Sequence, residues 1–343
     1  DSVTWRPAGN PDNLSWRKSR KTYAVQPPRV MTAKIKKKML DKEIPFHELP
    51  PKDIPLYEAA EEKEWADWQK NKRVTIIKGK EAAELRKTVS PSRIITLRFV
   101  YRDKNAAVRT PQLELPVKAK ARLCAQGSRE PMSLNGLVKL DSPTVQRIGI
   151  MVFLQLVANF GWFDTWRKGD ISSAFLQGAE RDVEKVGRLY LNPPKRFLKG
   201  VAPGDLLEVK KSVYGLPDAP RAWWEEFTGF VRKVGFIHSR IDVAFMVLYH
   251  DSGSLAAMII RHVDDIMVAT DGSKIAESVV EKIHDKYPFG EWEYVAKVKE
   301  VAYTGRQIRK EGNEIHFSQA DFANGRTEHL RSKDLRISQM TVC

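Results

Sequence analysis

The sequence predicts an α+β protein of about two domains. Its 343 residues exceed what one domain of ordinary size requires, and its hydrophobic fraction of 42% is typical of a chain with a buried core. Runs of residues with strand character occur in neighbouring pairs joined by polar turns, which is the pattern of antiparallel hairpins. Between these pairs lie segments in which apolar residues recur every three or four positions, as in helices that pack on a core.

The chain is strongly basic, with 58 Lys and Arg against 43 Asp and Glu and a net charge of +15. A surface of this sign attracts polyanions, so nucleic acid is the first partner to consider. Cys124 and Cys343 lie too far apart in sequence for a disulfide framework or a zinc-finger spacing, which is typical of a reduced, intracellular protein. The longest apolar stretch, residues 148–163, is shorter than the roughly 20 residues of a membrane span, so we expect no membrane partner.

Residues 1–60 predict a basic, largely extended N-terminal arm, because they combine runs of Lys and Arg with several prolines. A charge run fits a solvated linker and a non-specific nucleic-acid tether equally well. Helix-forming residues predominate over 57–72, and Trp65 and Trp68 share one helical face. This segment predicts a short docking helix.

Residues 94–123 contain two strand-like runs on either side of a polar turn near 103–105, which predicts a hairpin with a basic face. Ser142 and Pro143 then form a typical N-cap and N1 pair. The apolar spacing that follows them predicts a core helix, and Gly161 is a suitable residue to end it.

The middle of the chain alternates short strands and helices. Residues 163–171 and 206–215 predict strands, and Ser172 or Ser173 is a candidate cap for a short helix after the first of them. Asp218 is a candidate cap for a longer helix with an apolar stripe.

The C-terminal third predicts a strand, a hairpin with a polar centre, a helix and two short strands. Their predicted ranges are 244–251, 254–271, 273–287 and 301–319. Residues 325–343 are polar and show no clear period, so we expect a tail there.

Three acids interrupt otherwise apolar strands: Asp170 at a strand end, and Asp264 with Asp265 at the centre of the second hairpin. An unpaired buried carboxylate costs free energy, so each needs a reason to be there. Asp170 alone is equally well explained as a helix N-cap, and the doublet as a solvated β-turn. Together, three carboxylates suit hard divalent cations, two of which can promote an in-line phosphoryl displacement. Neighbouring strand residues point to opposite faces, so the doublet acts jointly only if a tight turn redirects it.

Three motifs, in order along the chain, carry a resemblance to a known family. They are Asp170-Ile-Ser-Ser-Ala-Phe-Leu-Gln-Gly178, Val213-Tyr-Gly-Leu-Pro-Asp-Ala-Pro-Arg-Ala-Trp-Trp224 and His262-Val-Asp-Asp265, with supporting segments at 118–127, 141–144 and 303–308. Over residues 65–324 the chain resembles the reverse transcriptase domain of copia-type LTR retrotransposon Pol polyproteins. Any one motif is weak alone, whereas several in family order over most of the chain are specific.

The resemblance implies a right-hand polymerase with fingers and palm over residues 61–324, in which helices back an antiparallel palm sheet. It also implies a thumb-like or connecting segment from about residue 273. The implied activity is that of an RNA-directed DNA polymerase, a nucleotidyltransferase that copies an RNA or DNA template. In this reaction the primer 3′-hydroxyl attacks the α-phosphate of a dNTP and pyrophosphate leaves.

In that family, the aspartates at three matching positions are catalytic and hold two Mg²⁺ ions, which Mn²⁺ can replace. Carried over, the catalytic and metal-binding residues are Asp170, Asp264 and Asp265, and the backbone carbonyl of Ile171 is a further metal ligand.

The resemblance also implies a nucleotide-binding set. Phe175 stands where related polymerases place an aromatic steric gate against a ribose 2′-hydroxyl, although its spacing fits a core Phe nearly as well. Lys120 and Arg122 would reach the triphosphate, with a solvated strand face as the alternative. Gly215 would allow a close approach of the backbone to the template or nucleotide base.

The chain departs from the family pattern at His262, which stands where Tyr is usual, and at Gln126 and Pro217-Asp218, where positive charge is usual. We find no RNase H, integrase or protease motif, so other Pol segments are expected as partners if the chain is part of a longer polyprotein. Two alternatives stay open: a decayed retroelement relic that only binds nucleic acid, and a non-enzymatic basic RNA-binding protein. The expected compartment is the cytoplasm, in a particle, or the nucleus.

Overall fold

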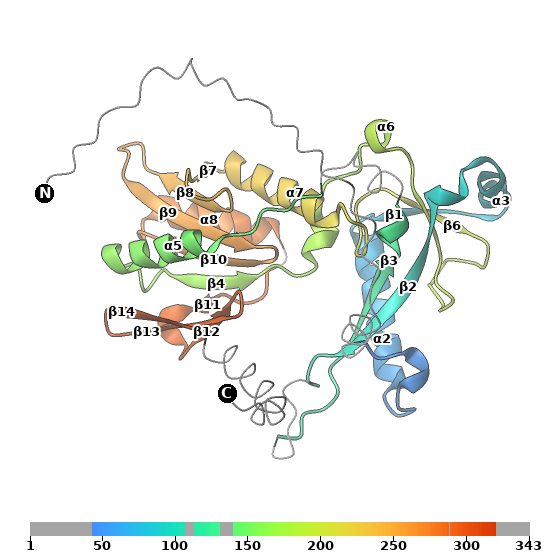
Figure 1. Ribbon diagram of the computed structural model, residues 1–343, viewed down its shortest axis with the longest axis horizontal. Helices are drawn as coiled ribbons and strands as arrows, with labels where there is room; N and C mark the ends of the chain where they lie inside the picture. The colour runs from blue at the N-terminus through green and yellow to red at the C-terminus, as the bar shows by residue number, and fades with distance from the viewer. Residues whose placement is uncertain (1–42, 107–112, 131–139, 288, 320–343) are drawn as a thin grey trace, which may run out of the picture. The chain divides into compact units, whose positions relative to one another are not determined.

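A computed structural model describes residues 43–106, 113–130, 140–287 and 289–319 of the chain (Figure 1). The chain divides into two units, residues 1–44 and 45–343, and the fold that follows is that of the second unit. The predicted basic arm lies outside the described residues up to position 42, and the predicted tail over 325–343 lies outside them altogether.

The largest sheet in the described part of the chain has six antiparallel strands in the order β11-β4-β10-β9-β8-β7. Their bounds are β4 (Arg167–Asp170), β7 (Ile237–His238), β8 (Phe245–Tyr249), β9 (Leu255–His262), β10 (Asp265–Thr270) and β11 (Glu293–Tyr294). Strands β9 and β10 form the hairpin that the sequence predicts, and their register pairs His262 with Asp265. Both strands are buried along almost their whole length, which explains their nearly continuous apolar sequence.

Helices cover both faces of this sheet. Helix α5 (Arg147–Phe160) packs on one face, whereas α7 (Ala219–Lys233) and α8 (Lys274–Lys286) pack on the other. Adjacent residues of β10 alternate between the two cores, because neighbouring side chains of a strand point to opposite faces: Met267 joins the α5 side, and Ile266 joins the side of α7 and α8. The α+β fold with an antiparallel sheet and packed helices is therefore confirmed.

The ends of these helices agree only in part with the sequence. Gly161 ends α5 in the left-handed conformation, as predicted. The predicted cap at Ser142 is wrong, because α5 begins at Arg147 and the Asp242 carboxylate accepts a hydrogen bond from the backbone N–H of Gln146 at 2.6 Å. A side chain about a hundred residues away thus supplies the cap.

Helix α8 begins as predicted, with the Ser273 hydroxyl accepting a hydrogen bond from the backbone N–H of Ala276 at 3.2 Å. Its residues Val280 and Ile283 belong to the same core as β9 and β10. The segment from residue 273, which we expected to be thumb-like, therefore begins with a helix that packs on the six-stranded sheet.

A second sheet of five strands has the order β1-β6-β5-β2-β3. Its strands are β1 (Val74–Ile77), β2 (Ile94–Asp103), β3 (Ala119–Ala125), β5 (Tyr190–Asn192) and β6 (Leu206–Val209). Strands β2 and β3 form the predicted hairpin, with Arg102 directly opposite Lys120. Residues opposite each other lie on one face of a sheet, so the predicted basic face is confirmed.

The predicted docking helix is α2 (Ile54–Lys70), which packs along β3 and buries Trp65 and Trp68. The helix begins at Ile54, whereas we expected the basic arm to extend to residue 60. Pro55 lies in the first turn, where proline is well tolerated. Glu64 accepts hydrogen bonds from the backbone N–H of Leu123 on β3 at 3.1 Å and from Trp68 Nε1 at 3.3 Å. Helix α2 therefore satisfies a donor on the edge strand of the five-stranded sheet.

Two strands are predicted over residues 301–319, and the structure has three, which form a small sheet that packs on the α5 side of the core. They are β12 (Val301–Tyr303), β13 (Arg306–Glu311) and β14 (Glu314–Ser318). The remaining helical elements are η2 (Phe46–Glu48), α3 (Gly79–Thr88), η3 (Pro91–Arg93), η4 (Gly127–Arg129), η5 (Ala174–Gln177), α6 (Val183–Val186) and η6 (Val295–Lys297). None of the helices in the described ranges combines the length and the apolar composition that crossing a bilayer requires.

The predicted side-chain cap of α7 by Asp218 is also wrong. Asp218 occupies the N-cap position, yet its carboxylate makes no capping hydrogen bond and lies 2.7 Å from Arg181 Nη1. The Arg181 side chain is only 3% exposed, so the ion pair takes precedence over the cap.

We predict that Asp218→Ala lowers the free energy of unfolding by about 3 kcal/mol, because it leaves the buried Arg181 guanidinium with only the Glu130 carboxylate, 3.8 Å away, as a partner. The matched control is Glu225→Ala, which removes one of two acidic partners of Arg221 at a half-exposed position and should cost less than about 1 kcal/mol. Urea unfolding of both variants tests this, and equal losses would show that Asp218 is only a surface charge.

Candidate active site

The hairpin that carries Asp264 and Asp265 turns sharply at its tip. Strand β9 ends at His262 and β10 begins at Asp265, which leaves Val263 and Asp264 to make the turn. Val263 has a positive φ of 63°, an uncommon conformation for a β-branched residue. Its carbonyl accepts a hydrogen bond from Trp223 Nε1 of α7 at 2.8 Å, which ties the tip to the helix layer. This is the tight turn that the doublet requires.

The register of β4 against β10 brings Asp170 to the same place. Asp170 is the last residue of β4 and lies directly opposite Asp265. Just beyond it, the backbone N–H of Ile171 donates a hydrogen bond to the carbonyl of Asp264 at 2.9 Å. Side chains of directly opposed residues share one face of a sheet, so Asp170 and Asp265 are neighbours. The backbone thus juxtaposes all three aspartates.

The doublet carries charge that its surroundings disfavour. Burial raises the pKa of Asp264 above its usual range, and the nearby Asp170 carboxylate raises it further. Burial likewise raises the pKa of Asp265, together with the charges of Asp170 and Asp264, whereas the Lys168 ammonium opposes this shift. Lys168 Nζ lies 3.2 Å from Asp265 Oδ1. The cluster therefore gains from any cation that comes close to it.

Among the described residues, no three Asp, Glu, His or Cys side chains stand close enough together to form a finished metal site. The backbone register brings the aspartates together, while the carboxylate of Asp265 is paired with Lys168. The residues still fit a hard divalent cation, because all three donors are carboxylates and a lysine ammonium already stands in as the counter-charge. The main-chain carbonyl of Ile171 stays a predicted ligand.

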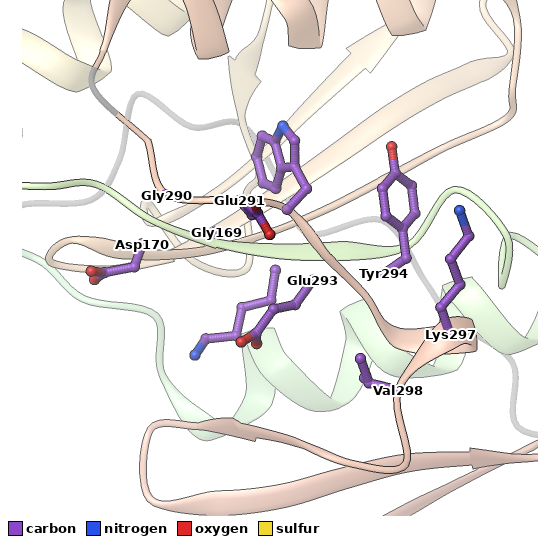
Figure 2. Close-up of a pocket in the computed structure, with 10 residues that line it drawn as sticks. Gly169, Asp170, Gly290, Glu291, Glu293, Tyr294, Lys297 and Val298 are labelled. Atoms are coloured by element: carbon purple, nitrogen blue, oxygen red, sulfur yellow. The ribbon is translucent and has the colours of Figure 1, made fainter. Parts of the chain in front are cut away.

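A cavity of about 600 Å³ opens beside Asp170, between β4 and the segment 290–298. Figure 2 shows Asp170 at one end of the cavity and Tyr294 with Lys297 at the other. Lys168 also lines it. The sequence gives no signal for this cavity, since its two walls are more than a hundred residues apart.

The predicted nucleotide-binding cations, Lys120 and Arg122, lie on β3 of the five-stranded sheet and interact electrostatically with the aspartates. Burial lowers the pKa of Lys120 to about 8, with Arg122 and Lys104 contributing and the charge of Asp170 opposing. Arg122 in turn counteracts the raised pKa of Asp264. Both cations are half-buried, and their contact with a triphosphate stays a prediction.

Tyr214 connects Arg122 to the turn that follows Asp170. The Arg122 guanidinium lies 5.3 Å from the centre of the Tyr214 ring, and the Phe175 ring meets Tyr214 edge-on at 5.8 Å. Contrary to expectation, the side chain of Ser173 does not cap η5, and this residue has a positive φ of 53°. Phe175 is half-buried against the core of α7 and α8, so it is neither a fully buried core residue nor free in solvent. Its role as a gate stays a prediction.

Gly215 is closely approached by the backbone of Ala125 in the same chain. A Cβ at this position would overlap the carbonyl oxygen of Ala125 on β3, and Gly215 has a φ of 88°. The backbone N–H of Ala125 also donates a hydrogen bond to the carbonyl of Tyr214 at 2.7 Å. Glycine is therefore required for packing on β3. A contact with the template or nucleotide base stays a prediction.

The departures from the family pattern differ in their surroundings. His262 pairs with Asp265 across the hairpin turn, and its charge lowers the pKa of Asp264. The backbone N–H of Gln126 bonds to the carbonyl of Thr96, while its side chain is exposed. Pro217-Asp218 lacks the usual positive charge, and the carboxylate of Asp218 is paired with Arg181.

Two residues of the site were missed in the sequence. Tyr214 lies inside a quoted motif, and its ring contacts depend on packing that no spacing reveals. Lys168 gives a weak signal, because it precedes Asp170 by two positions and so shares a strand face with it.

Three aspartates juxtaposed by the strands of an antiparallel sheet are the arrangement that the resemblance to polymerases leads us to expect. Comparison with known proteins agrees. The family model described as reverse transcriptase (RNA-dependent DNA polymerase) matches residues 81–334. The chain therefore belongs to the reverse transcriptase family, whose members generally depend on a divalent metal ion.

The similar curated proteins are copia-type Pol polyproteins, which confirms the resemblance. The Retrovirus-related Pol polyprotein from transposon RE2 of Arabidopsis thaliana is 26% identical over 225 residues, or 65% of this chain and 14% of that protein. The polyprotein from transposon RE1 of the same plant is 27% identical over 168 residues, covering 49% of this chain and 11% of that protein. That from transposon TNT 1-94 of Nicotiana tabacum is 25% identical over 161 residues, covering 47% and 12%. The match thus spans only a small part of each relative.

Among solved structures, the chain is similar to apo telomerase from Candida tropicalis truncated from its C-terminal domain. The TM-score is 0.37 at 9% sequence identity, and the alignment covers 77% of this chain and 60% of that one.

We predict that Asp264→Asn stabilises the metal-free protein at pH 7, raising Tm by about 1–4 °C. The pKa of Asp264 is raised by folding, so ionisation disfavours the folded state above the ordinary pKa of 3.8. The gain should vanish below about pH 4, where the carboxyl is neutral in both states. Thermal unfolding in EDTA, with the exposed Asp251→Asn as control, tests this, and a lower Tm would contradict the electrostatic picture.

We predict that Gly215→Ala is much more destabilising than Gly253→Ala. The two glycines have similar φ values, 88° and 83°, but only Gly215 has an obstructing neighbour. Gly253→Ala should cost about 1–2 kcal/mol for the backbone conformation alone, and Gly215→Ala a further 1–3 kcal/mol or so for the overlap with Ala125. Equal losses in urea unfolding would refute the packing explanation.

Proposed function

We propose that this chain is an RNA-directed DNA polymerase that adds deoxynucleotides to a primer 3′-hydroxyl with a divalent metal ion, Mg²⁺ or Mn²⁺. The observation that carries the proposal is the register that sets Asp170 opposite Asp265, with Ile171 bonded to Asp264. Membership of the reverse transcriptase family supports the same chemistry. The primer-template and the dNTP would be the substrates, and other Pol segments would be partners in a polyprotein.

Asp170, Asp264 and Asp265 would hold the metal ions, with the Ile171 carbonyl as a further ligand. When bound, two such ions supply positive charge at the attacking and the leaving oxygen of the displacement. Asp264 and Asp265 are suited to this task because they are partly buried and short of positive charge, and the strand register sets the exposed Asp170 opposite Asp265. Their fixed main-chain positions reduce the reorganisation that accompanies binding.

Lys120 and Arg122 would bind the triphosphate. Lys120 is mostly protonated at neutral pH, since burial lowers its pKa only to about 8, and the Arg122 guanidinium can bind phosphate oxygens in a bidentate manner. Partial burial strengthens their attraction for phosphate oxygens. The exposed Arg98 and Arg102 on the same hairpin would contact the nucleic-acid backbone.

Phe175 would exclude the ribose 2′-hydroxyl. Its ring is held by Tyr214 and by the core of α7 and α8, and it lies five residues after Asp170. A ring fixed in this way is suited to excluding a single hydroxyl group by steric overlap, because it has little room to move aside.

The test is primer extension on an RNA template with the full chain, in Mg²⁺ and in Mn²⁺. We expect incorporation that EDTA abolishes and that Asp170→Asn and Asp264→Asn each lower about 10²-fold or more. The exposed Asp251→Asn serves as control for a carboxylate away from the cluster. Folding of each variant is checked by thermal unfolding.

Incorporation that persists in Asp264→Asn would contradict the proposed roles. If the unmodified chain binds primer-template in a salt-sensitive manner but incorporates nothing with either metal, the decayed-relic alternative gains and the proposed activity fails.

A further inference from the structure

Lys168 occupies an unusual place for a lysine. It lies in β4, between β10 and β11, and precedes Asp170 by two residues, so both side chains project from the same face of the strand. Its Nζ lies 3.2 Å from Asp265 Oδ1, and the two side chains are only 17% and 26% exposed. A pair this protected is weakly screened by salt.

The ion pair stands inside the carboxylate cluster. Asp265 is directly opposite Asp170 and adjacent to Asp264, so the ammonium neutralises part of a group of three negative charges. A divalent cation bound by the Asp265 carboxylate would lie close to the Lys168 ammonium that now contacts its Oδ1. Two cations cannot occupy one carboxylate at close range without strong repulsion.

We propose that the Lys168 ammonium is the built-in counter-ion of the metal-free aspartate cluster and competes with the divalent cation for Asp265. The inference rests on the proposed function, because it assumes that the aspartates bind metal. It assigns to Lys168 a role that weakens metal binding and stabilises the protein when no metal is present.

The fold provides a second position for the displaced ammonium. Glu293 of β11 lies directly opposite Lys168 in the sheet and is exposed. Both residues line the cavity of about 600 Å³ next to Asp170, and Figure 2 shows the Glu293 carboxylate within it. A lysine has four rotatable side-chain bonds, so its ammonium can leave Asp265 for Glu293 without movement of the backbone.

The test is a titration of the full chain with Mn²⁺, in which electron paramagnetic resonance measures the concentration of the free aqueous ion. Lys168→Met removes the charge and keeps a side chain of similar length, and it should bind Mn²⁺ about three- to tenfold more tightly than the unmodified chain. Lys168→Arg keeps the charge and should bind no more tightly.

Lys297→Met is the matched control, since Lys297 lines the same cavity but its Nζ lies over the Tyr294 ring at 4.7 Å. It should change Mn²⁺ affinity by less than twofold or so, as expected for a distant surface charge. An equal gain from Lys168→Met and Lys297→Met would mean that only the overall charge matters, which overturns the competition.

Thermal unfolding gives a readout that does not depend on activity. Without metal, Lys168→Met should lower Tm, because three carboxylates lose their counter-ion, and saturating Mn²⁺ should raise its Tm by more than it raises that of the unmodified chain. Unchanged Mn²⁺ affinity and an unchanged metal-induced shift would overturn the inference.

The double variant Asp170→Asn, Asp264→Asn separates this inference from the proposed function. If Mn²⁺ binding is lost in the double variant but equal in the unmodified chain and Lys168→Met, the metal site stands and the competition is wrong. If Mn²⁺ binding survives unchanged in the double variant, the metal is elsewhere, and both the proposed site and the inference fail.

Discussion

The antiparallel pairing of β4 with β10 is the constraint on which the candidate site depends. It sets Asp170 opposite Asp265, and the main-chain bond from Ile171 to Asp264 extends the same pairing to the turn. A slip of one residue would move Asp170 to the other face of the sheet. Burial prevents such a slip, because Met267 and Ile266 of β10 are each fixed in a different core.

This pairing brings negative charges together, and the structure balances them from two sides. Lys120 and Arg122 act from the five-stranded sheet, at a distance, whereas Lys168 contacts Asp265 directly. The balance is incomplete, since the pKa values of Asp264 and Asp265 remain raised. A site that is short of positive charge in this way is prepared for a cation at some cost in stability.

Much of the fold follows from local sequence patterns. The hairpins, the docking helix with Trp65 and Trp68, the end of α5 at Gly161 and the start of α8 at Ser273 each depend on residues a few positions apart. The three aspartates could be chosen because charge inside apolar strands is costly and demands a reason.

What the sequence could not reveal depends on distant contacts. Ser142 is a good cap by composition, but Asp242 from another part of the chain supplies the cap to α5. Asp218 pairs with Arg181 instead of capping α7, and Gly215 is required by its close packing on Ala125. Both contacts join residues that are far apart in the sequence. The pairing of Lys168 with Asp265 needs the strand order, which no local pattern gives.

The central claim is that Asp170, Asp264 and Asp265 form one cation site. Anomalous diffraction from crystals grown with Mn²⁺ and a primer-template tests it most directly. We predict manganese peaks in contact with these three carboxylates and an empty space where Lys168 Nζ met Asp265. Peaks that lie elsewhere, with the Lys168–Asp265 pair intact, would contradict the account.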